Sequence, residues 1–235
     1  MERLDKLISH GGGYSRRDVK EMVRQGRVTV NGSPAASADQ KVERDCQIRV
    51  DGAVLCCEMK TYLLLHKPAG ILTATEDKKQ KTVMDLLPSE YRHRGLSPVG
   101  RLDKDTEGLL LLTNDGELNH RLTSPKYGIE KTYEAVVDGT LDQEDVATFA
   151  AGIHLHDMEC LPAKLDIMST NRCLVTVQEG KFHQVKRMLQ SRGKPVSYLK
   201  RWSMGPLQLP ADLPRGEYRP LTSEEVQTLR VVCKL

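Results

Sequence analysis

Apolar and polar residues follow a helical period at the start of the chain. Apolar side chains between positions 4 and 8 recur at helical spacing, three glycines interrupt them, and Ser15 is placed to cap a second helix that ends near Gln25. Two short alternating runs follow, at 28–30 and 47–50, and each leads into an Asn-Gly or Asp-Gly turn. The first fifty residues are therefore predicted to form two helices followed by short strands.

From Thr61 onward the pattern favours strands with a few helices between them. Strands are expected at 62–65, 71–75, 108–113, 131–137, 162–167 and 173–177. Helices are expected at 83–87, 118–122, 143–151, 182–192 and 223–230. This order predicts an α+β fold around a mixed, mostly antiparallel sheet. We expect a small domain at 1–52, a linker at 53–60 and a larger domain at 61–235.

Composition supports a folded, soluble protein. The chain has 235 residues, of which 39% are hydrophobic and 29% charged, values typical of globular domains. No run of 18 apolar residues occurs and the first residues lack a signal-peptide core, so we expect a cytoplasmic protein without a membrane segment. The six cysteines form no Cys-x-x-Cys pair, which favours reduced thiols that serve in packing.

The net charge of +3 conceals a local excess of basic residues. Residues 1–30 contain seven basic and four acidic side chains, and on the second helix the basic ones share an arc beside the apolar one. A solvated helix face is the alternative to an RNA-binding surface. The candidate RNA-binding residues of this segment are Arg3, Lys6, Arg16, Arg17, Lys20, Arg24 and Arg27.

An acidic loop stands directly before a run of four leucines. Asp103, Asp105 and Glu107 lie between Gly100 and the buried strand expected at 108–113. Calcium binding would fit the spacing of these acids, but the loop lacks the glutamate that an EF-hand places at its twelfth position. Glycoside hydrolysis would need two carboxylates and sugar-stacking aromatic residues, and the chain has one tryptophan. The remaining alternative is that the acids merely stabilise turns.

A second basic stretch, residues 181–202, has seven basic residues and no acidic one, with aromatic residues between them. Such a mixture suits phosphates and splayed bases. On the helix expected at 182–192, Lys186 lies at the margin of the apolar arc and Arg187 points away from it. A zinc site at His154 and His156 would lack a convincing fourth ligand, so we expect no metal.

Several segments resemble known families. The motifs at 3–8, 15–17 and 23–32 resemble the S4 RNA-binding domain. The segment Gly100-Arg-Leu-Asp-Lys-Asp-Thr-Glu-Gly-Leu resembles RNA pseudouridine synthases, in particular the RsuA branch, whose members modify ribosomal RNA. Further segments fit the same family in the same order, at 65–70, 123–126, 130–133, 179–188 and 216–221.

The pseudouridine synthase resemblance implies a site without a cofactor. Asp103 matches the family's nucleophile, Tyr133 its active-site tyrosine and Lys186 its basic position. Arg101 would hold a phosphate or the place that a flipped uridine vacates, and Arg187 would contact RNA. The implied partner is ribosomal RNA or a pre-ribosomal particle, and the implied target is in the small subunit, with the large subunit as the alternative.

Two positions depart from the RsuA pattern, since His66 replaces a common Asn and Glu107 a common Thr or Ser. These departures leave the target uridine open. We expect a monomer that binds no membrane. The competing hypothesis from another class is an S4-type ribosome-associated binding protein without catalysis. The presence of Asp103, Tyr133 and Lys186 together favours the enzyme.

Overall fold

The computed structural model describes residues 1–43, 46–55 and 60–235. Its contacts divide the chain into two compact units, of which the smaller contains Met1–Thr61 together with Leu87–Ser97. The larger unit contains Tyr62–Leu86 and Pro98–Leu235. The chain therefore passes between the units three times.

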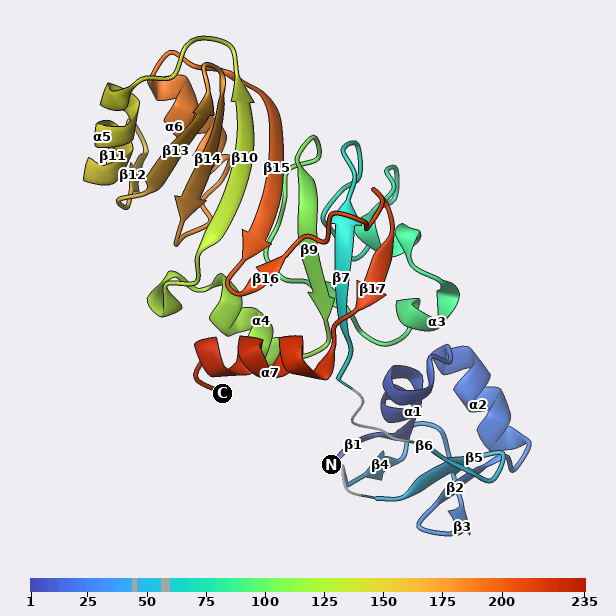
Figure 1. Ribbon diagram of the computed structural model, residues 1–235. Helices are drawn as coiled ribbons and strands as arrows, with labels where there is room; N and C mark the ends of the chain where they lie inside the picture. The colour runs from blue at the N-terminus through green and yellow to red at the C-terminus, as the bar shows by residue number, and fades with distance from the viewer. Residues whose placement is uncertain (44–45, 56–59) are drawn as a thin grey trace. The chain divides into compact units, whose positions relative to one another are not determined.

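The smaller unit packs two helices, α1 (Leu4–Gly12) and α2 (Arg16–Arg24), with short strands. The strands of its four-stranded sheet lie in the order β3-β2-β5-β6 (Figure 1), and β1 pairs with β4. The bounds are β1 Glu2–Arg3, β2 Val28–Val30, β3 Ser33–Pro34, β4 Lys41–Val42, β5 Ile48–Val50 and β6 Ala53–Leu55. The predicted helix pair and the strands at 28–30 and 47–50 are confirmed. The sheet continues through Leu55, three residues into the expected linker.

Helix α2 has the amphipathic arrangement that its sequence predicts. Val19 and Met22 are buried against α1, and the hydroxyl of Ser15 accepts a hydrogen bond from the amide of Asp18 at the N-terminus. The Asp18 carboxylate accepts one in return from the Ser15 amide, which completes a capping box. The basic side chains of α2 are therefore left on its exposed face.

The segment Leu87–Ser97, which includes α3 (Ser89–Arg92), packs within the smaller unit although its sequence position is inside the larger one. The hydroxyl of Ser9 on α1 donates a hydrogen bond to the carbonyl of His93 at 3.4 Å. A side chain at Gly13, where φ is 70°, would meet the carbonyl oxygen of Glu90 at 2.7 Å. Close backbone packing therefore joins this segment to the N-terminal helices.

The larger unit is built on one mixed sheet with strand order β13-β14-β10-β15-β9-β7-β17 (Figure 1). Every neighbouring pair on this path is antiparallel except β15 and β9, which confirms the predicted α+β fold with a mostly antiparallel sheet. Its strands are β7 Tyr62–Lys67, β9 Glu107–Thr113, β10 Lys131–Val137, β13 Lys164–Ser169, β14 Arg172–Val177, β15 Val196–Met204 and β17 Tyr218–Pro220. Short strands are β8 Ser97–Pro98 beside β9, β16 Leu207–Gln208 beside β15, and the hairpin of β11 Ile153–Leu155 and β12 Met158–Cys160.

Helices cover this sheet and bury its central strands. The helices are η1 Val83–Leu86, α4 Gly116–Thr123, η2 Pro125–Tyr127, α5 Gln143–Ala151, α6 Gln184–Ser191 and α7 Ser223–Val232. Leu109 and Leu111 of β9 pack with residues of α4 and α7, and Leu110 and Leu112 on the opposite face are equally inaccessible. The predicted buried strand at the four leucines is confirmed.

The structure differs from the predicted elements in three places. The strand expected at 71–75 is a loop with a single bridge between Leu72 and Thr82, because Thr73 uses its hydroxyl to bind the backbone of Leu102. The nine-residue strand β15 was not predicted, since its charged residues suggested a surface segment. The helix expected from Phe182 begins at Gln184.

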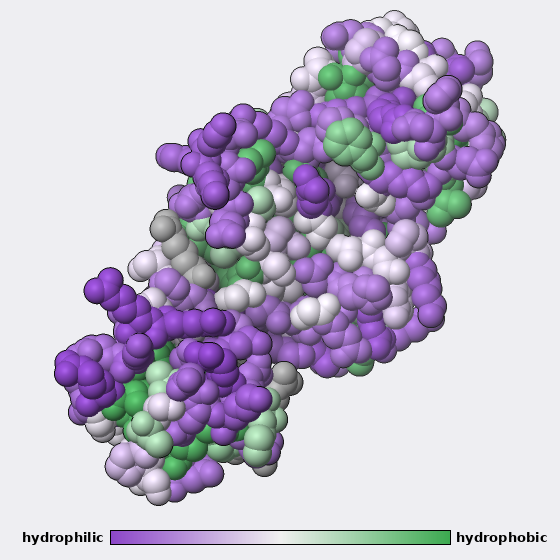
Figure 2. Space-filling model, turned by 180° about the vertical axis from the view of Figure 1, so that it is seen from behind, coloured by the Kyte–Doolittle hydropathy of each residue, from purple (hydrophilic) through white to green (hydrophobic). Residues whose placement is uncertain are grey.

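The four described cysteines are free thiols, and those of the larger unit are buried. Cys56 and Cys57, like residues 58 and 59 of the expected linker, lie outside the described residues. Within the described residues, no helix is long and apolar enough to cross a membrane. The side of the molecule shown in Figure 2 is mainly hydrophilic, with apolar residues in scattered patches.

Candidate active site

Asp103 lies on a loop between β8 and β9 that is fixed by its backbone. The ammonium of Lys67, at the end of β7, is completely buried and donates hydrogen bonds to the carbonyls of Asp103, Lys104 and Thr106 at 2.8–3.2 Å. The hydroxyl of Thr73 donates to the carbonyl of Leu102 at 2.7 Å. The acidic loop is thus anchored around one cation, which leaves its side chains free for other contacts.

Burial lowers the pKa of Lys67 to about 8, and the neighbouring carboxylates, that of Asp105 foremost, oppose this effect. The carbonyls that accept from Lys67 also favour its charged form. Lys67 is part of the 65–70 motif, but nothing in that motif indicates that its ammonium organises the loop.

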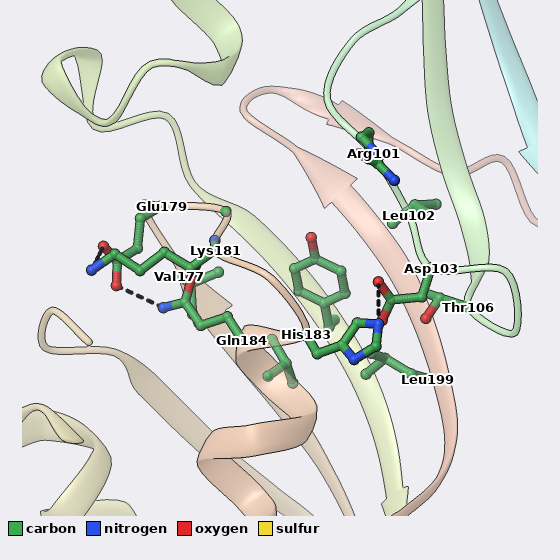
Figure 3. A pocket seen from close by; sticks show the side chains of 13 residues that line it. Arg101, Leu102, Asp103, Thr106, Val177, Glu179, Lys181, His183, Gln184 and Leu199 are labelled. Carbon is green, nitrogen blue, oxygen red and sulfur yellow. Dashed lines mark hydrogen bonds and ion pairs between the residues drawn. The ribbon is translucent and has the colours of Figure 1, made fainter. Parts of the chain in front are cut away.

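The Asp103 carboxylate faces two basic side chains, that of His183 just before α6 (Figure 3) and that of Lys186 within α6. Its Oδ2 lies 3.2 Å from Lys186 Nζ and its Oδ1 lies 3.4 Å from His183 Nε2. A quarter of the Asp103 side chain is exposed, through a pocket that Tyr133 and Leu199 also line. Three predicted catalytic residues, from a loop, a strand and a helix, therefore gather at one place.

Lys186 is shared between two carboxylates. Its Nζ lies 2.6 Å from Asp105 Oδ1, and this hydrogen bond lowers the pKa of Asp105. The Asp105 side chain is 75% exposed, whereas that of Asp103 is 25% exposed. Of the two acids, Asp103 is the one held inside the pocket.

Tyr133 comes from β10, where it is paired with Arg201 of β15 and with Val175 of β14. It is 9% exposed, and its neighbour on the same face, Ala135, is completely buried. The strand therefore fixes the tyrosine with its side chain in the pocket wall.

His183 is a site residue that sequence reasoning missed, because its position depends on the local backbone conformation. Its φ of 51° places it in the left-handed region just before α6, and this turns its ring toward Asp103 (Figure 3). Non-glycine residues adopt this conformation rarely, often at functional sites.

Glu179 and Gln184 brace the other wall of the pocket. The buried Glu179 carboxylate accepts hydrogen bonds from Gln184 Nε2 at 2.7 Å and from the amide of Leu161 at 3.0 Å (Figure 3). Gln184 in turn accepts from the amide of Lys181 at 3.1 Å. These contacts hold the chain that presents His183, and the 179–188 motif alone did not reveal them.

The two arginines of the larger unit that are expected to contact RNA differ in whether they have an ion-pair partner. Arg101 is exposed at the pocket and forms no hydrogen bond or ion pair with any described residue. Arg187 forms an ion pair with Asp157 of the β11–β12 hairpin, so part of its charge is already compensated.

The basic residues of the smaller unit also fall into two groups. Arg3, Lys6, Arg24 and Arg27 form ion pairs with acidic neighbours. Hydrogen bonds from Arg24 and Gln25 lower the pKa of Glu21 to about 2. Arg16, Arg17 and Lys20 are exposed and form no ion pair within the described ranges. They also line a surface groove, and they are the free cations of this face.

The alternatives for the acidic loop do not fit the arrangement of its side chains. Glu107 accepts a hydrogen bond from the Tyr198 hydroxyl at 2.9 Å, whereas Asp103 and Asp105 face Lys186. His154 is on β11, whereas His156 is in the following turn, so the two do not alternate along one strand. No group of three metal-ligating side chains is found among the described residues.

Comparisons with known proteins agree with these features. Residues 2–53 match the family model of the S4 domain, and residues 61–191 match that of RNA pseudouridylate synthase. A ribosomal small subunit pseudouridine synthase A of Yersinia pestis is 39% identical, with 97% of each chain covered. A ribosomal large subunit pseudouridine synthase B of Bacillus subtilis (strain 168) is 40% identical, with 99% of this chain and 97% of that one covered. A crystal structure of a pseudouridylate synthase superposes with a TM-score of 0.69 at 36% identity, over 97% of this chain and 100% of that one.

Proposed function

Because the chain belongs to the RNA pseudouridylate synthase family, we propose that it isomerises one uridine of ribosomal RNA, in the small subunit, with Asp103 as the nucleophile. The single observation that carries the role of Asp103 is its carboxylate, which is held in a pocket against Lys186 and beside Tyr133. Ribosomal RNA as substrate places the protein in the cytoplasm, and we propose that it acts there as a monomer.

The reaction is an isomerisation that needs no oxidant or reductant. The bond between N1 of uracil and C1′ of ribose breaks, a bond between C5 and C1′ forms, C5 loses a proton and N1 gains one. A carboxylate can attack an electron-poor carbon without a cofactor. Attack at C1′, attack at C6 and a route through a glycal all require Asp103.

The other two residues orient the reactants. Lys186 holds the Asp103 carboxylate from one side at 3.2 Å, which limits its orientations. The Tyr133 ring offers a flat surface to the uracil, and its hydroxyl can assist proton transfer at C5. Since Asp103 lies in a pocket, the target uridine must leave its stack, and Arg101 at the pocket can occupy the vacated place or hold a phosphate.

The smaller unit supplies RNA affinity. Exposed cations that lack ion-pair partners gain most from phosphate contacts, since paired ones must first give up an existing interaction. Arg16, Arg17 and Lys20 meet this condition. We propose that these three dock structured RNA, with weaker contributions from the paired basic residues.

The relative named for the small subunit is 39% identical to this chain, and the one named for the large subunit is 40% identical. Sequence identity therefore does not distinguish between the two target RNAs. The small subunit is favoured because the amino-acid sequence of the motif from Gly100 to Leu109 resembles that of the RsuA branch. A uridine of the large subunit is the second candidate.

The direct test measures tritium release from 16S and 23S transcripts labelled at uracil C5. Asp103→Asn should reduce release by at least about 10³-fold while RNA affinity changes by less than about threefold, because the substitution preserves shape and removes the nucleophile. The matched control is Asp105→Asn, since Asp105 binds the same lysine outside the pocket. It should retain activity within about tenfold.

Full turnover by Asp103→Asn would refute its role as nucleophile. If the wild-type chain binds both transcripts and releases no tritium from either, the non-catalytic binding protein is the better account.

A further inference from the structure

Phe182 is an aromatic side chain with no place in the hydrophobic core. Its side chain is 73% exposed, whereas Phe149, the second phenylalanine of the chain, is completely buried. It is the only aromatic residue among the large exposed hydrophobic residues of the described ranges. A ring exposed on this scale has apolar surface that it can still bury against a binding partner.

The position of Phe182 links it to the site. Its ring stacks on that of His183 with centroids 3.8 Å apart and planes 20° from parallel. The His183 ring lies in turn 3.4 Å from the Asp103 carboxylate. Lys181 and His183, the neighbours of Phe182 on either side, both line the pocket (Figure 3). The exposed ring therefore stands at the rim of the pocket.

The backbone holds this aromatic pair in place. His183 has its unusual left-handed conformation directly after Phe182, and Glu179 and Gln184 brace the segment from within. A non-glycine residue in that conformation persists only where the surrounding structure enforces it. The braced backbone and the stacked His183 ring thus define the position from which Phe182 presents its exposed face.

The surrounding chemistry selects nucleic acid as the occupant. Most cations of the stretch from 181 to 202 already have carboxylate partners, but the exposed guanidinium of Arg101 at the same pocket has none among the described residues. A flat aromatic ring beside cations is the arrangement on which single-stranded bases stack. An apolar protein partner would instead be expected to bury a larger continuous patch.

We propose that Phe182, backed by His183, is a stacking platform for the base of a nucleotide adjacent to the target uridine. This inference rests on the proposed function, because it takes the uridine at Asp103 as its reference. It adds a binding subsite and explains how a base next to the flipped one is held once its stacking partner has left.

The test uses RNA nonamers with one central uridine and the fluorescent base 2-aminopurine on its 5′ or its 3′ side. With the full-length protein, one of the two nonamers should show quenching as its reporter base stacks on the ring. Phe182→Ala should abolish the quenching and weaken binding by about 5- to 150-fold, the range for one lost base–aromatic stack. Because Phe182 is exposed, its substitution should leave the fold intact.

Matched variants separate stacking from general apolar contact. Phe182→Trp should keep the affinity, and Phe182→Leu should lose it, since leucine retains apolar surface but has no ring. For a nonamer with an abasic residue at the quenched position, wild type and Phe182→Ala should bind equally.

Three results would overturn the platform: no quenching with either nonamer, equal binding by Phe182→Leu and Phe182→Trp, or an undiminished effect of Phe182→Ala on the abasic nonamer. Tritium release by the wild-type enzyme is measured in parallel on 16S and 23S transcripts. Release without quenching refutes only the platform, whereas quenching without release refutes only the proposed reaction.

Discussion

Lys67 and Lys131 are both buried lysines, and their surroundings give them different roles. Lys67 donates to several carbonyls of the Asp103 loop, so its burial is compensated by hydrogen bonds. The Lys131 ammonium forms no hydrogen bond with the described residues. Burial, with a smaller contribution from nearby Arg201, lowers the pKa of Lys131 to about 8. Lys131 is therefore predicted to cost stability.

Lys131→Met should raise the free energy of unfolding at pH 7 by about 1–3 kcal/mol, the usual cost of an uncompensated buried polar group. The pKa of Lys131 is near 8 when folded and 10.5 when unfolded, so the unfolded chain binds more protons between these values. The free energy of unfolding of the wild type should consequently increase relative to that of the variant as pH rises from 8 to 10.5.

Urea unfolding of both proteins across this pH range provides the measurement. The exposed Lys126→Met serves as control and should change stability by less than about 0.5 kcal/mol. A difference between wild type and Lys131→Met that stays constant with pH would contradict the assignment.

The sequence predicted the candidate catalytic residues better than the residues that hold them in position. Asp103, Tyr133 and Lys186 were assigned from motifs, and their roles remain predictions although the structure brings them together. His183 escaped notice because its role depends on a left-handed backbone, which helical periodicity cannot indicate. Glu179 was missed because the motif does not show that its side chain is buried, nor that it accepts a hydrogen bond from the amide of Leu161 in another segment.

At the scale of elements, the contact between β9 and β15 lies where the Asp103 loop ends and β9 begins. These parallel strands pair only through Lys200 with Glu107 and Arg201 with Gly108. The buried Arg201 then donates from Nε to the carbonyl of Leu109 at 2.8 Å, in place of a further ladder bond. The residue pattern of β15 does not indicate a buried strand, because the charged residue Arg201 occupies a core position.

Gly108→Ala should destabilise the protein by about 3 kcal/mol or more. The added methyl group would lie 2.2 Å from the carbonyl oxygen of Arg201, and φ there is 110°. Gly116→Ala is the control, since that site at the start of α4 has open space and alanine favours a helix. Thermal unfolding of both variants measures the difference, and equal midpoints would show that β9 and β15 need no close approach.

At the scale of the whole molecule, the family matches confirm both resemblances drawn from the motifs, and with them the order of an S4 domain and a pseudouridine synthase domain. What the sequence could not predict is that Leu87–Ser97 packs within the smaller unit. That packing depends on contacts between distant segments, such as Ser9 with His93. Deleting residues 1–52 would therefore remove contacts that this segment makes, such as the hydrogen bond between Ser9 and His93.

Charge substitutions test RNA docking without this damage. Replacing Arg16, Arg17 and Lys20 by alanine should reduce the slope of log K against log salt by about 2–3 for rRNA transcripts, because three phosphates are no longer neutralised. The control replaces Arg24 and Arg27, which already have ion-pair partners, and should change the slope by less. An unchanged slope in the triple variant would exclude these residues from the RNA interface.

The central claim is that this chain converts one ribosomal uridine through Asp103. Its most direct test is to map pseudouridine across the ribosomal RNA of cells that carry the wild-type chain, no chain, or Asp103→Asn. One pseudouridine in 16S rRNA should be present in cells with the wild-type chain and absent in both other strains. A complete modification map in cells with Asp103→Asn, or an identical map in all three strains, would contradict it.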